Sequence, residues 1–353
     1  MRGTLHSLCL MMTRTRGRKA RSTRLPNLSL FTFHLLLLSA LFACRVKAQT
    51  PITLQLDWKA NAQFAGPLVA KEAGWYQESG LDVTIRPAGE HTDPVAEVVN
   101  HPGWIGVGEA DVLLVARTKG KPIKAFATMF QTTPLVLMTL KSSGLKNFPD
   151  LRQKRIGLHS DSQKAIDVLL RFNRMTRADV SVVEVPYSLD LLLQGKVDAM
   201  QGYSVDEAVD LTLRGHPVNS IPMSENGYVA YAEVLFTTQK FLDSDPKTLA
   251  TFLKVTNRGW DRAVREPAAT AKMIVTKYLV GGDAAYQAAS IRAIQPLLNH
   301  ETHDARLGWM QPATWTASER MFNQYKILDV PVHAEGLTDY RILEILYGHG
   351  QGR

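Results

Sequence analysis

The chain has 353 residues and a formal charge of +8, but its positive charge is concentrated at the start. Residues 1–48 hold nine of the 41 Lys and Arg residues and no Asp or Glu, so the rest carries 32 basic and 33 acidic groups, a net charge of −1. This balance excludes nucleic-acid binding based on an overall basic charge. Both cysteines, Cys9 and Cys44, lie in the same initial segment, so the rest of the chain has no disulfide or thiolate chemistry.

The initial segment is typical of a secretory signal. Its basic residues precede an apolar stretch over 28–44, and Val46-Lys47-Ala48 has the small-residue pattern at which a signal peptidase cleaves. We therefore predict a signal peptide over 1–48 and export to the periplasm. Two alternatives stay open. The apolar stretch is nearly long enough to remain as a membrane anchor, and Cys44 is a candidate for lipidation, although Phe42 is bulky where that signal usually has a small residue.

The stretch 54–86 predicts a strand, a loop, a helix and a second strand. Apolar and polar residues alternate over 54–58, apolar residues recur at helical spacing over 64–69, Gly74 ends the helix, and alternation returns over 81–85. A strand, a crossover helix and a strand favour parallel pairing, and ligands of parallel sheets bind beyond the carboxyl ends of the strands. We therefore expect the loop from Asp57 to Asn61 to face a ligand.

The rest of the chain predicts an α/β protein of two lobes. Strands are expected at 104–107, 123–129, 135–140, 155–158, 182–185, 197–200 and 233–236, and helices from 109, at 163–172, at 189–194 and beyond 243. We assign 49–140 and 232–353 to lobe 1 and 141–231 to lobe 2. The two crossings, near 140 and 231, then form a hinge that permits closure around a ligand.

Several polar turns supply candidate binding residues. Trp58 follows the first strand, where its indole can stack on a flat heteroaromatic ring, and the alternative is a core tryptophan. The segment 106–111 joins a strand to a helix and places Glu109 and Asp111 beside backbone N–H groups, although ordinary turn chemistry explains its glycines equally well. The turn 159–162 is its counterpart in lobe 2, with helix capping as the alternative. The predicted ligand-binding residues are Asp57, Trp58, Asn61, Glu109, Asp111, Ser160, Asp161, Ser162, Tyr203, Glu207 and Tyr228.

Six short segments recur in this order and spacing in one known group of proteins. They are Leu56-Asp57-Trp58, Val69-Ala70-Lys71, Gly80-Leu81-Asp82-Val83, Gly106-Val107-Gly108, Gly195-Lys196-Val197-Asp198-Ala199 and Gly202-Tyr203. On these segments nearly all of the chain after residue 50 resembles the periplasmic solute-binding superfamily, in the branch of thiamine-precursor-binding proteins and thiamine pyrimidine synthases. The resemblance implies a type II periplasmic-binding fold, in which each lobe is a mainly parallel sheet flanked by helices, with a hinge between the lobes.

The resemblance also implies a role for Glu207. A ligand-binding carboxylate closely follows the Gly-Tyr pair in this family, and a carboxylate can accept hydrogen bonds from the amine and ring nitrogen of an aminopyrimidine. The alternative is a solvated acid in the first turn of a helix. Tyr228 and Tyr231 are further candidates for stacking. The two histidines of 300–304 lie in a polar segment and do not predict a metal site.

The synthases of this family consume a lysine-bound pyridoxal phosphate and their own histidine, and hold iron near a cysteine-rich segment. At the corresponding positions this chain has Gly108 for the lysine and Val112 for the histidine, no cysteine over 229–233, and Phe64 for a further histidine. Glycine has no amine with which to form a Schiff base.

We therefore predict a binding protein rather than an enzyme, without cofactor or metal. It captures a small polar heteroaromatic, such as a thiamine pyrimidine precursor, and delivers it as a monomer to an ABC permease at the inner membrane. A synthase and a sensory module remain alternatives. Because Phe64 is apolar where the family has an imidazole, a different heterocycle or an organic anion such as a sulfonate also stays open.

Overall fold

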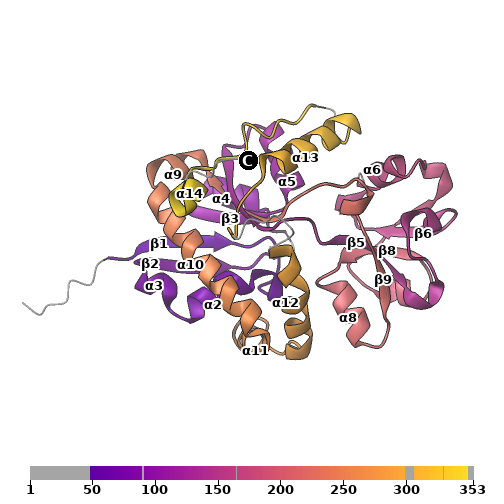
Figure 1. Ribbon diagram of the computed structural model, residues 1–353, viewed down its shortest axis with the longest axis horizontal. Coiled ribbons are helices and arrows are strands. Elements are labelled where there is room, and N and C mark those ends of the chain that lie inside the picture. Colours follow the sequence, from indigo (N-terminus) through magenta and orange to yellow (C-terminus); the bar gives the residue numbers. More distant parts are fainter. Residues whose placement is uncertain (1–47, 90, 164, 299–305, 329, 349–353) are drawn as a thin grey trace, which may run out of the picture. The chain divides into compact units, whose positions relative to one another are not determined.

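The computed structural model describes residues 48–353 except 90, 164, 299–305, 329 and 349–353 (Figure 1). The predicted signal peptide therefore lies outside the described residues, apart from Ala48, and so do His300 and His303. The part of the chain from Ala48 onward is one compact unit with two sheets of five strands each. None of the helices that the structure describes is both long and apolar enough to cross a membrane.

The first sheet has the strand order β2-β1-β3-β10-β4. Its strands are β1 (Thr50–Gln55), β2 (Leu81–Arg86), β3 (Trp104–Gly108), β4 (Ile123–Phe130) and β10 (Ala232–Thr238). β1 pairs in parallel with β2 and β3, which confirms the predicted crossover, whereas β10 is antiparallel to both of its neighbours. Because β10 runs the opposite way, it begins at the edge where β1 and β3 end.

The second sheet repeats this plan in the order β7-β6-β8-β5-β9. Its strands are β5 (Leu135–Leu140), β6 (Arg155–Leu158), β7 (Ser181–Glu184), β8 (Ala199–Tyr203) and β9 (Val218–Pro222). The predicted boundary after residue 140 falls too late, because β5 pairs with β8 and β9 rather than with the first sheet. The chain therefore crosses between Phe130 and Leu135, and returns between Pro222 and Ala232.

Helices flank both sheets (Figure 1). Those of the first lobe are α2 (Ala65–Glu72), α3 (Trp75–Glu78), α4 (Pro94–Asn100), α5 (Ala110–Thr118), α9 (Gln239–Ser244), α10 (Pro246–Arg265), α11 (Pro267–Lys277), α12 (Ala284–Leu298), α13 (Pro312–Gln324) and α14 (Arg341–Tyr347). The second lobe has α6 (Ala165–Phe172), α7 (Asp190–Leu193) and α8 (Glu207–Leu213). Short 3₁₀ turns are η1 (Ala62–Phe64), η2 (Lys141–Ser143), η3 (Phe148–Leu151), η4 (Ser160–Ser162), η5 (Arg177–Asp179) and η6 (Ser224–Asn226).

β1 is more deeply buried than the alternation of its residues predicts. Gln55 is buried like its apolar neighbours Leu54 and Leu56, and its side-chain amide donates to the backbone carbonyls of Leu56 at 2.9 Å and Arg86 at 3.3 Å. Alternation is typical of a strand with one exposed face, but helices cover both faces of this largely parallel sheet. The strand also ends at Gln55, so that Asp57 and Trp58 belong to the loop that follows.

Close packing of α2 against α10 holds the first lobe together. The α10 residues Leu249, Phe252, Leu253 and Trp260 are all buried. A Cβ added at Gly259 would lie 2.0 Å from the carbonyl oxygen of Gly66, so the two helix backbones approach each other at these glycines. The C-terminal helices thus fix the frame from which the β1 and β3 loops project.

Candidate ligand-binding site

A cavity of about 430 Å³ is lined by residues that lie at strand ends of both sheets. The first sheet contributes Asp57 after β1, Glu109 after β3 and Glu233 at the start of β10. The second contributes His159 after β6 and Tyr203 at the end of β8. The sheet edges at which we expect ligands, beyond the carboxyl ends of the parallel strands, therefore line the same cavity.

Eight of the eleven predicted residues line this cavity, namely Asp57, Trp58, Glu109, Asp111, Ser162, Tyr203, Glu207 and Tyr228. Asn61 and Ser160 are not among the described lining residues, and the side chain of Asp161 is not described. Asn61 is buried, accepts a hydrogen bond from the Gln63 backbone N–H at 3.0 Å and donates to the Gln63 side chain at 3.0 Å. It thus orients Gln63, which does line the cavity, while the ligand-binding role of all eleven residues stays a prediction.

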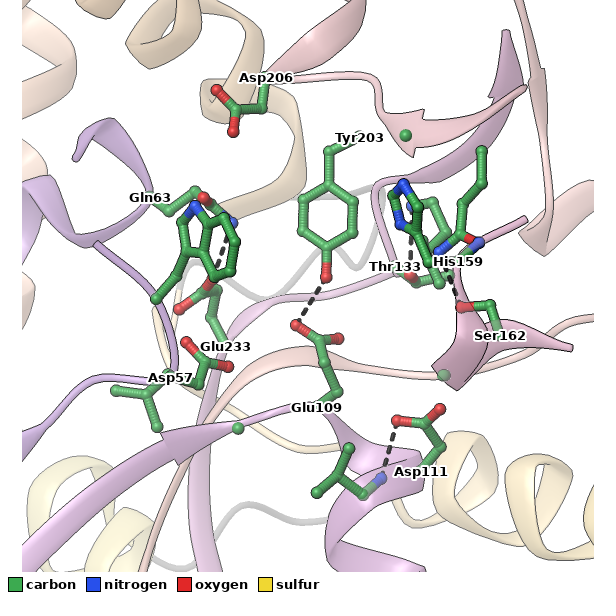
Figure 2. A pocket seen from close by; sticks show the side chains of 18 of the residues that line it. Asp57, Gln63, Glu109, Asp111, Thr133, His159, Ser162, Tyr203, Asp206 and Glu233 are labelled. Carbon is green, nitrogen blue, oxygen red and sulfur yellow. Dashed lines mark hydrogen bonds between the residues drawn. The ribbon is translucent and has the colours of Figure 1, made fainter. Parts of the chain in front are cut away.

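Three carboxyl groups converge on one side of the cavity, those of Asp57, Glu109 and Glu233 (Figure 2). Burial raises the pKa of Asp57 from 3.8 to about 6. Burial, together with repulsion by the neighbouring carboxylates, holds the pKa values of Glu109 and Glu233 well above their usual range. Burial and mutual repulsion therefore disfavour the ionised forms of these groups, and a ligand that supplies hydrogen-bond donors or positive charge would relieve the repulsion.

Hydrogen bonds fix two of these carboxyl groups. Glu109 accepts from the hydroxyl of Tyr203 at 3.0 Å, a contact that joins the two lobes (Figure 2), and from the backbone N–H of Glu233. Glu233 accepts from the side-chain amide of Gln63 at 3.4 Å. The backbone of Glu233 has a φ of 52°, a left-handed conformation that costs a non-glycine residue about 1–2 kcal/mol. Such strain is common at functional sites, and here it sets the carboxyl group at the start of β10.

A second acidic pair borders the cavity from the second lobe. Glu207 is the first residue of α8, and its carboxylate accepts from the backbone N–H of Tyr203 at 2.7 Å. Burial and the nearby Asp206 raise the pKa of Glu207 to about 7. Glu207 is partly exposed and lies in the first turn of α8, so its role as a helix acid stays an alternative to ligand binding. Asp206 accepts from the hydroxyl of Tyr286 on α12, which is a second contact between the lobes.

Aromatic rings form another part of the wall. Trp58 is 38% exposed, which excludes the alternative of a core tryptophan. Its ring lies 5.7 Å from that of Tyr187, and the Tyr187 ring lies 4.0 Å from that of His159. Tyr228 lines the cavity and donates to Asp111 at 2.6 Å. Tyr231, the other predicted stacking residue, is instead packed against Trp315 in the core.

Sequence reasoning missed several lining residues. They are Gln63, Thr92, Pro94, Val95, Thr133, His159, Tyr187, Gln201, Asp206 and Glu233, together with neighbouring apolar and glycine positions. Tyr187 follows β7, so the rule that places ligands at strand ends would have found it. His159 lies in the turn 159–162, next to the predicted residues Ser160, Asp161 and Ser162. Glu233 carries no such signal, because its position depends on the antiparallel direction of β10.

The cavity does not fit a lysine-bound pyridoxal phosphate. Its described lining residues include no lysine or arginine, and the position of the family lysine is Gly108, which lines the cavity itself. Among the residues that the structure describes, no group of three or more His, Cys, Asp or Glu side chains could hold a metal ion.

The family follows from comparison with known proteins. Residues 61–270 match the family model described as NMT1/THI5 like. The chain belongs to this family. It is 25% identical over 295 residues to the riboflavin-binding protein RibY of Chloroflexus aurantiacus, covering 80% of this chain and 83% of RibY. It is 26% identical over 223 residues to the 4-amino-5-hydroxymethyl-2-methylpyrimidine phosphate synthase of Legionella pneumophila, covering 61% and 70% of the two chains.

Solved structures establish the fold class. The alkanesulfonate-binding protein SsuA of Xanthomonas axonopodis pv. citri, bound to MOPS, superposes with a TM-score of 0.59 at 15% identity, covering 83% of this chain and 98% of SsuA. The ligand-binding component of an ABC-type import system from Staphylococcus aureus gives a TM-score of 0.62 at 11% identity, with 85% and 100% covered. The predicted α/β periplasmic-binding fold with two sheets is therefore confirmed.

Proposed function

We propose that the protein is an exported substrate-binding protein of an ABC importer, and that it captures a flat nitrogen heterocycle bearing hydrogen-bond donors. The cavity carries this proposal, because its lining combines a group of partly or fully buried carboxyl groups with aromatic rings. A thiamine pyrimidine precursor has the required chemistry, since its amine donates and its ring nitrogen can share a proton with a carboxyl group.

The aromatic rings and the carboxyl groups of the cavity have separate roles in this proposal. Trp58 and Tyr187 offer ring faces for stacking, which contributes about 0.5–1.5 kcal/mol beyond the area buried. Asp57, Glu109 and Glu207 offer acceptors whose pKa values are raised in the empty protein. A donor-rich or cationic ligand favours the ionised forms, so its binding should release protons to solvent near neutral pH.

The lining argues against an organic anion as the group held in this cavity. A sulfonate needs cationic or N–H donors, whereas the charged side chains among the described lining residues are all carboxyl groups. Moving an anion next to buried carboxylates would add repulsion without a compensating ion pair. We therefore do not extend the sulfonate ligand of SsuA to this protein, despite the shared fold.

A synthase activity is not proposed. The relatives named synthases make it a reasonable comparison, but Gly108 has no amine, Val112 has no imidazole, and the chain after residue 48 has no cysteine. Binding and release of an unchanged ligand requires none of these groups.

Export and hinge closure complete the proposal. The basic and apolar start of the chain supports secretion to the periplasm, and the fold is shared with a binding component of an ABC importer. The two crossings between the sheets provide a hinge. Tyr203 with Glu109, and Tyr286 with Asp206, supply contacts that would form as the lobes close.

Isothermal titration calorimetry on the protein purified from the periplasm tests the proposal. The panel is 4-amino-5-hydroxymethyl-2-methylpyrimidine, riboflavin, an alkanesulfonate and a neutral amino acid, each titrated in two buffers of different ionisation enthalpy to measure proton release. We expect saturable binding of the pyrimidine or riboflavin with proton release, and none of the sulfonate. Binding of the sulfonate alone would overturn the proposal. An aldimine absorbance after addition of pyridoxal phosphate would favour the synthase instead.

A further inference from the structure

A second cavity, of about 350 Å³, adjoins the one described above. The two share Val95, Asp111, Val112, Ser162 and Tyr228 as lining residues, so these residues form the junction between them. From the junction the second cavity follows α5 toward its C-terminal end. A ligand that spans both cavities would pass beside the Tyr228–Asp111 hydrogen bond, which lies at this junction.

The second cavity differs in chemistry from the first. Its wall is mainly apolar, with Val115 and Ala116 of α5, Ala165 of α6, and Phe322, Ile327 and Leu328 from the C-terminal part of the chain. Lys119 and Lys121, which follow α5, also line it. Its carboxyl groups already have partners in the fold, since Asp93 caps α4 through the N–H groups of Val95 and Ala96, and Asp111 binds the Val112 N–H and the Tyr228 hydroxyl.

The two cavities therefore differ in charge, because the second sets two lysines against Asp93 and Asp111, whereas the first is acidic. The first is bordered by carboxyl groups and has no described cationic side chain, whereas the second has two lysines beyond an apolar stretch. Lys119 is exposed and Lys121 is partly exposed, so both ammonium groups can reach an anionic group at the end of a flexible chain. Exposed lysines bind a phosphate or carboxylate as point charges and do not require a rigid geometry.

We propose that the second cavity is a subsite for the tail of the same ligand, and that this tail crosses the apolar stretch and ends in an anionic group bound by Lys119 and Lys121. The natural ligand is then a flat, donor-bearing ring joined by a chain to a phosphate or carboxylate. This inference rests on the proposed function, because it assumes that the ring occupies the first cavity.

Two series of probes that differ in their tails test the subsite by titration calorimetry. The flavin series is lumichrome, riboflavin and flavin mononucleotide, in which the ring has no chain, a neutral chain and a chain ending in phosphate. The pyrimidine series is 4-amino-5-hydroxymethyl-2-methylpyrimidine and thiamine monophosphate. In the series that binds, we expect the phosphate-bearing member to bind about tenfold or more tightly than the short member. The double variant Lys119→Glu/Lys121→Glu should weaken the long member at least about tenfold more than the short one.

The double variant Lys247→Glu/Lys254→Glu is the matched control, since it makes the same charge change on exposed residues of α10 away from both cavities. Equal affinity of short and long members, or equal effects of the two double variants on the long member, would overturn the subsite and leave the proposed function standing. Failure of every member of both series to bind would instead overturn the proposed function, and the subsite with it.

Discussion

Asp57→Asn should stabilise the empty protein at neutral pH while weakening its binding of ligand. The folded protein raises the pKa of Asp57 from 3.8 to about 6, mainly because folding removes much of the side chain from water. The folded state therefore binds a proton more tightly than the unfolded state, so this group lowers the free energy of unfolding as the pH rises from about 4 to about 6. Above pH 6 the cost remains in full, and asparagine, which does not ionise, removes it.

The size of the effect follows from the shift in pKa. A shift of roughly two units corresponds to at most about 3 kcal/mol. Asp57 keeps part of its surface in solvent, so we expect about 1–2 kcal/mol after allowance for screening. The substitution should also ease the repulsion felt by Glu109 and Glu233, whose pKa values the charge of Asp57 helps to raise.

Thermal unfolding at pH 4.5 and pH 8 measures this effect. We expect the unfolding temperature of Asp57→Asn to exceed that of the wild type by a few degrees at pH 8, and by much less at pH 4.5. Asp82→Asn, at an exposed position of β2, is the control and should change stability by no more than about 0.5 kcal/mol. An equal loss of stability at both pH values would refute the reasoning, because it would mean that ionised Asp57 stabilises the fold.

Three further substitutions separate binding from folding. Trp58→Ala should weaken binding of the pyrimidine or flavin about tenfold but leave the unfolding temperature nearly unchanged, since the ring is 38% exposed. Unchanged affinity in calorimetry would mean that the ligand does not bind at Trp58. Glu207→Gln should weaken binding of the pyrimidine about tenfold at pH 8 and less at pH 6, because the pKa of Glu207 is about 7; the same loss at both pH values would contradict the assigned charge. Gly259→Ala should destabilise the protein by about 1–3 kcal/mol or more in denaturant unfolding, because its Cβ would lie 2.0 Å from the Gly66 carbonyl oxygen. Lys254→Ala on the same helix is the control, and equal stability of the two variants would contradict the tight packing of α2 against α10.

The sequence predicts the architecture well because local patterns determine it. The crossover from β1 to β2 follows from alternation, helical spacing and a glycine at 74 whose φ is 75°. Pro246 and Pro267 begin α10 and α11, at the first helical position that proline favours. The boundary at residue 140 was placed too late because a strand's own sequence does not say with which sheet it pairs.

The site was predictable where strand ends define it and unpredictable where tertiary contacts do. Asp57 and Glu109 follow β1 and β3. The rule that ligands bind beyond the ends of strands therefore predicts both residues. Glu233 reaches the cavity because β10 starts at that edge, in a backbone conformation that no local signal predicts. Asn61 looked like a contact residue but supports Gln63, since side-chain hydrogen bonds two residues apart turn the longer amide toward the cavity.

Recovery of the ligand after binding tests the central claim most directly. The protein purified from the periplasm is saturated with 4-amino-5-hydroxymethyl-2-methylpyrimidine or riboflavin, and excess ligand is removed by dialysis. The protein is then denatured, and the mass and amount of the released compound are measured by mass spectrometry. The account predicts one molecule per chain with unchanged mass, and a marked loss of bound compound in Asp57→Asn and Trp58→Ala. A released compound of altered mass, or equal retention by the wild type and both variants, would contradict it.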